Sequence, residues 1–320
     1  MRGLRWTVLA IALISALSLA TPLWAQRVLL MPPQQTLGPP SSLWIGTGLA
    51  VALGETLTQG GVPTVPFEDL RSYYEQAGLV AAPSFTLASQ LGLAKQFGVG
   101  VLVGGTYEVA GESVSVNLKA YSTAGDLRQL ASFRETQSLQ ELLPLARKLS
   151  EDLAKALGRT WVPPAVVSPQ AFESYIRGRI STDPTLQEVY FRKAIEIQKD
   201  YYDASCYLAL VLKSAGQLSE CTALLVELEK KTFSKAYLGL LTLAEIRMEQ
   251  GRLPEARRLF LASLKASESA EGHMGLAQWY ARQNKTKEAL TELLVAERFG
   301  THQADIDALR RQLQEAQPPK

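Results

Sequence analysis

The chain has 320 residues, of which 47% are hydrophobic and 20% charged, with 33 Lys and Arg against 31 Asp and Glu. This composition excludes a disordered or polytopic membrane protein, and the length predicts about two domains. A net charge of +2 without a basic block gives no electrostatic footprint for nucleic acid. Two His and two Cys leave little material for metal centres or Cys/His catalysis, so we expect no cofactor and no metal.

The first 25 residues are typical of a secretory signal peptide. A positively charged start at 1–5 precedes an uncharged, Leu- and Ala-rich run at 6–20 that ends in small residues. Cleavage is expected after Ala25, with Ala20 as the alternative position. Retention as an anchor is a second alternative, because the run through Trp24 approaches the roughly 20 apolar residues that span a bilayer. We therefore expect a protein secreted across the cytoplasmic membrane, periplasmic or envelope-associated, with no integral membrane span after signal cleavage.

Strand and helix patterns alternate through residues 26–158. In chain order we expect a strand at 27–32, a helix at 43–59, an extended segment at 62–67, a helix at 85–97, strands at 99–107, 113–121 and 127–133, and a helix at 139–157. Leu49, Leu53 and Leu57 form one helical stripe, and every second residue from Val114 to Ala120 is apolar, as in a half-buried strand. This order predicts an α/β (α+β) sandwich domain with a mixed sheet.

Several stretches of this domain carry a family signal. They are 28–32, Gly48-Leu49 in the first predicted helix, 90–99 continuing through 101–107, 114–118 and 123–125. Together they resemble the TolB-like amino-terminal domain that precedes tetratricopeptide repeats in bacterial proteins. The loop at 33–42 departs from that family, because it is Pro-rich and lacks the usual Phe after the Pro. The resemblance implies an envelope-associated α/β module used in assemblies, and it implies no chemistry.

A Pro-rich linker at 159–167 precedes a region, 168–316, in which every convincing pattern is helical, and 317–320 is a polar tail. Phe191, Leu225, Phe260 and Leu293 recur at spacings of 34, 35 and 33 residues, which is the tetratricopeptide (TPR) period. Small residues recur where paired helices must approach closely: Ala209, Ala244 and Ala277 in first helices, and Cys221, Ala256 and Ala289 in second helices. We expect an all-α TPR solenoid with repeats at 168–201, 202–236, 237–269 and 270–302 and a capping helix at 304–316.

First helices of a TPR array line a concave groove that binds an extended peptide or a partner helix. The candidate partner groove comprises Lys213, Leu241, Glu245, Met248, Glu249, Met274, Gln278 and Arg282. The alternative is that these are ordinary solvated residues or, for Leu241 and Met274, core. A second candidate contact surface consists of the aromatic residues Trp44, Tyr73 and Tyr74 beside Pro-rich loops, with burial as the alternative for Trp44.

Other chemistry-bearing residues predict no catalytic site. Cys206 and Cys221 are expected to be two buried thiols, with a disulfide as the alternative. Gly46 and Gly48 form only part of a dinucleotide fingerprint. His273 and His302 have no Ser or carboxylate partner by motif, so we expect no catalytic residues.

The function predicted from these features is a non-enzymatic protein–protein interaction scaffold of the bacterial cell envelope, whose TPR groove binds a partner protein or peptide. The alternative is an envelope sensor whose α/β domain binds a small ligand or cell-wall fragment in a polar pocket near Trp44 and Gly48. Residues 1–25 hold two Arg and no acid, so the rest of the chain has no net charge. This balance disfavours long-range attraction to nucleic acid and leaves short-range protein contacts as the expected mode of binding.

Overall fold

The computed structural model describes residues 27–78, 85–124, 127–163, 167–232, 237–299 and 302–315. The predicted signal peptide, its cleavage positions and the tail at 317–320 lie outside these residues. Among the helices that the structure describes, none is long and apolar enough to cross a membrane.

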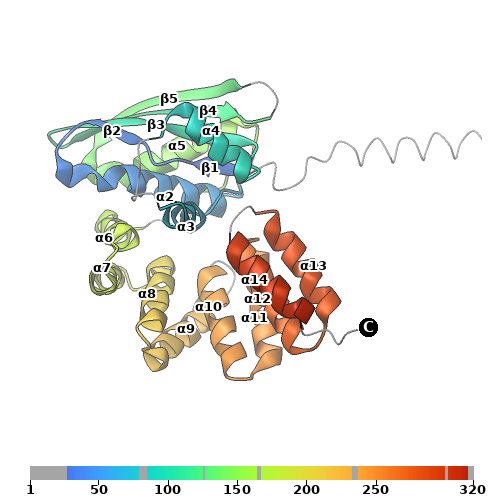
Figure 1. The fold of residues 1–320 in the computed structure, drawn as a ribbon. Coiled ribbons are helices and arrows are strands. Elements are labelled where there is room, and N and C mark those ends of the chain that lie inside the picture. Colours follow the sequence, from blue (N-terminus) through green and yellow to red (C-terminus); the bar gives the residue numbers. More distant parts are fainter. Residues whose placement is uncertain are drawn as a thin grey trace, which may run out of the picture.

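A mixed sheet of five strands forms the amino-terminal part (Figure 1). Its strands are β1 (Val28–Leu30), β2 (Gln34–Leu37), β3 (Val101–Ala110), β4 (Ser113–Ser122) and β5 (Arg128–Ser138). Strands β3, β4 and β5 form an antiparallel meander, while β1 and β2 both pair in parallel with β3, β1 along its first half and β2 along its second. The predicted strands of the meander and the first strand are therefore confirmed.

Helices cover the sheet unequally. They are α2 (Trp44–Gln59), α3 (Phe67–Gln76), α4 (Leu87–Gln96) and α5 (Leu142–Ala156), with single 3₁₀ turns at Pro40–Ser42 and Leu139–Glu141. Alternate residues of β3 and β4 pack with α2 and α5 in one apolar core, and α3 and α4 pack on the opposite face against β1 and Leu102. On this opposite face, the part formed by β4 and β5 is polar. For example, the hydroxyl groups of Ser115 and Thr136 form a hydrogen bond of 2.8 Å. Since one-sided burial requires strict alternation, this arrangement explains the period of two in β4.

Two elements differ from the sequence prediction. The segment at 62–66 is extended and bridges to Val28 through Thr64, as expected, but helix α3 begins at Phe67. Phe67, Leu70, Tyr73 and Tyr74 form the apolar face of α3 at helical spacing, and Pro66 and the acidic first turn favour a helix start, but the sequence prediction did not include this helix. The Pro-rich loop contains β2, whose polar sequence is held in place by pairing with β3.

An all-α region follows the sheet domain. Its helices are α6 (Pro169–Ile180), α7 (Pro184–Ile197), α8 (Tyr202–Ser214), α9 (Leu218–Thr232), α10 (Tyr237–Glu249), α11 (Leu253–Ala266), α12 (Ala270–Arg282), α13 (Thr286–Glu297) and α14 (Gln303–Glu315). Each helix packs on the next, and α8, α10, α12 and α14 also contact one another in sequence. The six recurring small residues have no exposed surface, and the Cys221 thiol donates a hydrogen bond of 3.1 Å to the carbonyl oxygen of Ala209. The small residues thus lie where neighbouring helices come closest.

The sheet domain lies against the helical region through α2 and α3 (Figure 1). Gly48 allows one close approach, because a Cβ atom there would lie 3.0 Å from Cγ2 of Ile176 on α6. The linker is also attached to the sheet domain: the Trp161 indole donates a hydrogen bond of 3.2 Å to the carbonyl of Thr56. We refer to the contact zone of α2 and α3 with the helical region as the seam.

Candidate functional site

The predicted partner groove is only partly open. Leu241 and Met248 are 5% and 4% exposed and belong to the main apolar core. This confirms the core alternative for Leu241, and placing Met248 in the groove was wrong. They are buried because α10 has neighbours on several sides, namely α8, α9, α11 and α12. Met274 is half-buried and packs with α13 and α14, as its core alternative expected.

The polar members of the predicted groove remain accessible to different degrees. Glu249 and Gln278 are exposed, whereas Lys213 and Glu245 are half-buried and form an ion pair of 2.5 Å between α8 and α10. Arg282 is exposed, but its Nη1 donates a hydrogen bond of 2.7 Å to the carbonyl of Met248. The accessible surface of the first helices is therefore polar and mixed in charge.

The three aromatic residues do not form one contact surface. Tyr74 is buried, and Tyr73 packs edge-on against it and against Phe97 in the core beside α4. Trp44 belongs to the other core and is half-buried, with the Arg177 guanidinium 5.0 Å from its ring centre. The prediction of an exposed aromatic surface is wrong for Tyr74, because α3 turns its apolar face towards the sheet.

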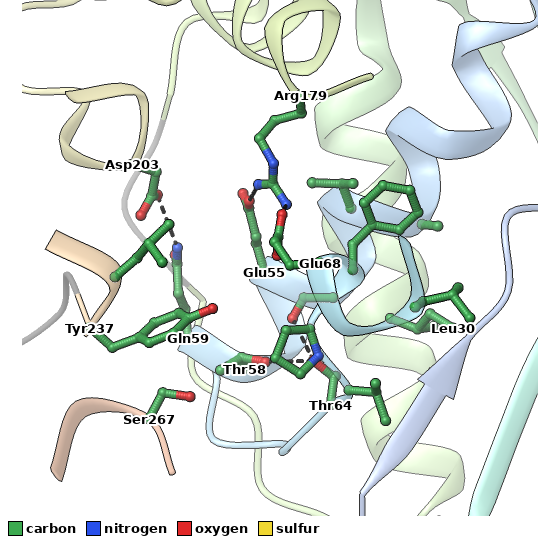
Figure 2. Close-up of a pocket in the computed structure, with 18 of the residues that line it drawn as sticks. Leu30, Glu55, Thr58, Gln59, Thr64, Glu68, Arg179, Asp203, Tyr237 and Ser267 are labelled. Carbon is green, nitrogen blue, oxygen red and sulfur yellow. Dashed lines mark hydrogen bonds and ion pairs between the residues drawn. The ribbon is translucent and has the colours of Figure 1, made fainter. Parts of the chain in front are cut away.

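The seam encloses a cavity of about 290 Å³ that the sequence did not predict (Figure 2). Its lining comes mainly from α2, the 64–68 segment, α6, the start of α8 and the start of α10. The charged and larger polar groups among the lining residues are Glu55, Gln59, Glu68, Tyr175, Arg179, Asp203, Tyr207 and Tyr237. A wider cleft of about 670 Å³ adjoins it and shares Thr58, Thr64 and Ser267. Clefts between domains are common places for ligand sites.

Arg179 is the central cation of this cavity and is 3% exposed. Its Nη1 lies 2.9 Å from Oε1 of Glu55, and its Nη2 donates to Glu68. The guanidinium also lies 3.8 Å from the centre of the Tyr207 ring. Burial by itself lowers the pKa of Arg179, but Glu68 and its other neighbours raise that pKa well above its usual value. The side chain therefore stays charged and fastens α6 to both α2 and α3.

Two acids of the cavity hold their protons more tightly than usual. Burial and the neighbouring charge of Asp203 raise the pKa of Glu55 to about 8, and burial raises the pKa of Asp203 as well. Asp203 accepts one long hydrogen bond, 3.5 Å, from Nε2 of Gln59. Around neutral pH, Arg179 is thus balanced chiefly by Glu68, while Glu55 is largely protonated.

The thiols and phenols near the cavity are in environments that disfavour their ionised forms. Cys206 and Cys221 are both free and buried, which confirms the predicted thiols rather than a disulfide. Burial raises the pKa of Cys206, and it raises the pKa values of Tyr207 and Tyr237 well above their usual range. These neutral groups are suited to packing and hydrogen bonding, since a nucleophile needs a lowered pKa.

Both histidines have carboxylate partners, contrary to the motif-based prediction. Nδ1 of His273 lies 2.7 Å from Oε2 of Glu292, and Nε2 of His302 lies 3.1 Å from Oε1 of Glu271. These two partners are distant in the sequence, and each histidine also lies 3.6 Å from a nearby acid, Glu268 for His273 and Asp305 for His302. Arg179 was detectable in the sequence, because it follows Phe172, Tyr175 and Ile176 on the buried stripe of α6.

Comparison with protein-family models gives no match to this chain, and comparison with curated proteins gives none either.

Proposed function

We propose that the protein is a non-enzymatic scaffold of the bacterial cell envelope, in which a TPR-type array of helices binds a partner protein or peptide. The observation that carries the proposal is the set of six buried small residues recurring at the TPR period. They permit close packing of successive helices, which leaves polar positions of the first helices available for a partner. The signal-like first 25 residues support an envelope location.

The partner surface is the polar row formed by Lys213, Glu245, Glu249 and Gln278. Glu245 and Gln278 occupy equivalent repeat positions on α10 and α12, and Glu249 lies one helical turn beyond Glu245. Carboxylate and amide groups in such a row suit the backbone and basic side chains of an extended segment. The sheet domain occupies the amino-terminal ends of these helices through Asp203 and Glu271 and so leaves their other ends for the partner.

The test is capture from an envelope extract with the full chain as bait. We expect Glu249→Arg to reduce recovery of a specific partner several-fold relative to the wild type. Glu288→Arg is the matched control, because Glu288 is equally exposed but lies on the second helix α13. A partner recovered equally well by both variants, or no specific partner at all, would count against the scaffold.

A second candidate function is favoured by the cavity in the seam. The cavity is at the carboxyl end of α2, away from the Trp44 and Gly48 region where the sensor alternative expected a pocket. Among the described residues, Asp203 accepts only one long hydrogen bond, from Gln59, and Tyr207 and Tyr237 add aromatic surface. An acid beside aromatic rings suits a small amine.

Thermal unfolding with putrescine, spermidine and glucosamine tests this candidate. A rise in melting temperature that disappears in Asp203→Asn and persists in Asp200→Asn, an exposed residue nearby, supports it. Equal responses of the two variants would contradict it.

A further inference from the structure

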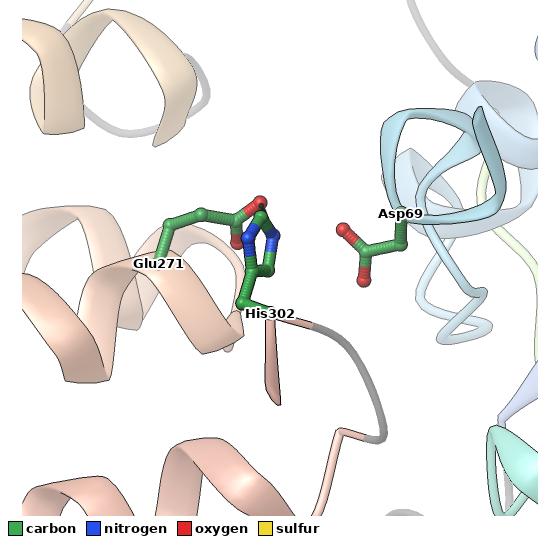
Figure 3. A group of neighbouring side chains, drawn as sticks. All are labelled: Asp69, Glu271 and His302. Atoms are coloured by element: carbon green, nitrogen blue, oxygen red, sulfur yellow. Dashed lines mark hydrogen bonds and ion pairs between the residues drawn. The ribbon is translucent and has the colours of Figure 1, made fainter. Parts of the chain in front are cut away.

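Three side chains from distant parts of the chain meet in the seam (Figure 3). Asp69 comes from the first turn of α3, Glu271 from the first turn of α12, and His302 from the residue before α14. One ligand atom of each lies within 4.8 Å of the other two. The carboxylate of Asp69 approaches from the sheet domain, opposite the two groups of the helical region. The cluster therefore spans the two parts of the protein.

Asp69 has an unusual environment for an acid. The residue is 1% exposed, and its Oδ1 has no hydrogen-bond donor among the described residues. A buried carboxylate oxygen without a donor is costly unless a proton or a cation is bound to it. Figure 3 shows this carboxylate directed towards the imidazole of His302. The carboxyl group that contains the unpartnered oxygen thus points into the cluster.

His302 is held in an uncommon backbone conformation. Its φ of 56° lies in the left-handed region, which disfavours residues other than Gly. This conformation places Nε2 3.1 Å from Glu271, while Nδ1 lies 3.6 Å from Oδ2 of Asp305. A carboxylate behind the second ring nitrogen is the arrangement that orients many metal-binding histidines.

The cluster offers a cation two carboxyl groups and one imidazole. Asp69 supplies its carboxyl group from the sheet domain, and Glu271 and His302 supply theirs from the helical region. A bound cation requires these groups in their deprotonated forms, so protons compete with it for the site.

Other charged groups face the cluster. Glu68 acts on Asp69 from the same helix, and the positive charge of Arg27 favours ionised Asp69 but opposes a cation. The guanidinium of Arg27 is held elsewhere, since its Nη2 donates a hydrogen bond of 3.1 Å to Phe97 and the group lies 4.9 Å from the Phe299 ring centre. Asp305 adds negative charge next to His302.

We propose that Asp69, Glu271 and His302 bind one divalent transition-metal ion of the Zn²⁺ type, which joins the sheet domain to the helical region. One imidazole and two carboxylates favour such an ion over Mg²⁺ or Ca²⁺, which prefer oxygen ligands alone. Three protein ligands leave a fourth, tetrahedral position for water. The ion has a structural role here, separate from the binding of a partner by the helical array.

The test is titration of the chelator-treated full chain with Zn²⁺ by calorimetry, and with Co²⁺ by visible absorption. We expect one equivalent of metal ion to bind, with an affinity that falls as the pH is lowered, because protons compete for the ligand atoms. Asp69→Asn, Glu271→Gln and His302→Gln should each weaken binding by at least about 100-fold, more than the loss of an orienting partner costs. His273→Gln is the matched control, since His273 also contacts two acids, Glu292 and Glu268, and should leave binding unchanged.

The outcomes that overturn the proposal are distinct. Absence of saturable binding to the wild type overturns the site. If Asp69→Asn still binds the metal ion, the ion does not join the sheet domain to the helical region. If His273→Gln loses binding, the metal site includes His273 and is not the proposed one. Circular dichroism of each variant in the presence of chelator identifies those that fail to fold. The ligand variants that do fold then show whether the three residues bind the ion. Zn²⁺ should also raise the melting temperature of the wild type but not of any folded ligand variant.

Discussion

The interior of the helical region and the seam are both buried, but they are built from different interactions. The interior consists of apolar residues at repeat positions, such as Ala209, Ala244 and Phe260, none of which has exposed surface. The seam buries Arg179 and Asp69 and raises the pKa of Glu55 to about 8. Apolar packing depends on volume and is insensitive to pH, whereas buried charges depend on their partners and on protonation. The two regions should therefore respond differently to substitution and to pH.

The largest expected effect is in the interior. Phe260→Ala should lower the free energy of unfolding by about 3–5 kcal/mol, because it opens a cavity where the ring packs against Gly275. Urea unfolding measures the loss. Leu261→Ala is the control: Leu261 is the next residue but is 42% exposed, and the change should stay below about 1 kcal/mol. Equal losses in both variants would contradict the assigned interior.

Removing the buried cation of the seam should lower the free energy of unfolding by less than the loss of an interior aromatic ring. Arg179→Met should lower the free energy of unfolding by about 3 kcal/mol at neutral pH, because it removes a buried cation and leaves the half-buried Glu68 without its partner. The loss should shrink at acidic pH, where the carboxyl groups are protonated. Arg177→Met removes an exposed pair with Glu173 on the same helix and should cost less than about 1 kcal/mol. A pH-independent loss in Arg179→Met would contradict the electrostatic role of Arg179.

We expect titratable groups of the seam to make the stability of the protein depend on pH. Folded Glu55, with its pKa of about 8, keeps a proton that the unfolded chain releases near its usual value of 4.5. Between these values the folded state binds more protons, so its stability falls as pH rises, by at most about 1.4 kcal/mol per pH unit. His302, with its pKa raised to about 9, extends the fall from about pH 6.5 to 9.

Unfolding followed at several pH values separates the two groups. Glu55→Gln should flatten the profile between pH 4.5 and 8, and His302→Gln should flatten it above pH 6.5. Phe260→Ala should shift the whole profile with little change in slope. A slope unaffected by Glu55→Gln would show that this acid is not buried with its proton.

The smallest effect is expected at the ion pair of Lys213 and Glu245. Both side chains are partly exposed, so a double-mutant cycle with Lys213→Met and Glu245→Gln should give a coupling of about 0.2–1 kcal/mol. Added salt should reduce it, since exposed charges are screened. A coupling near 3 kcal/mol would place this pair with the seam rather than with the polar surface of the helices.

Most regular elements were predictable because their side chains follow the period of their backbone. The stripe of α2 and the alternation of β4 each have many apolar positions that agree with one another. Helix α3 is short and its apolar face consists mainly of aromatic residues that also suit strands, and β2 is polar, so neither was predicted. Their structure depends on β1, α4 and β3, which are distant in the sequence.

The candidate sites were less predictable than the elements. Leu241 and Met248 have repeat positions typical of a groove, but additional neighbours bury them. Arg179 interrupts an apolar stripe, which marks it as unusual without naming Glu55 and Glu68 as its partners. Asp69, Glu271 and His302 share no motif, so their meeting follows only from how the two parts of the chain pack.

The sequence by itself determined the mixed sheet, the following helices and the small residues between them, because local periodicity and side-chain size specify which face of each element is buried. The contacts in the seam follow only from the tertiary structure. It determines which acids surround Arg179, which oxygen of Asp69 lacks a donor, and where the cavity lies. The reason is physical, since burial and electrostatic interactions depend on distance in space, and residues far apart in the chain supply the partners.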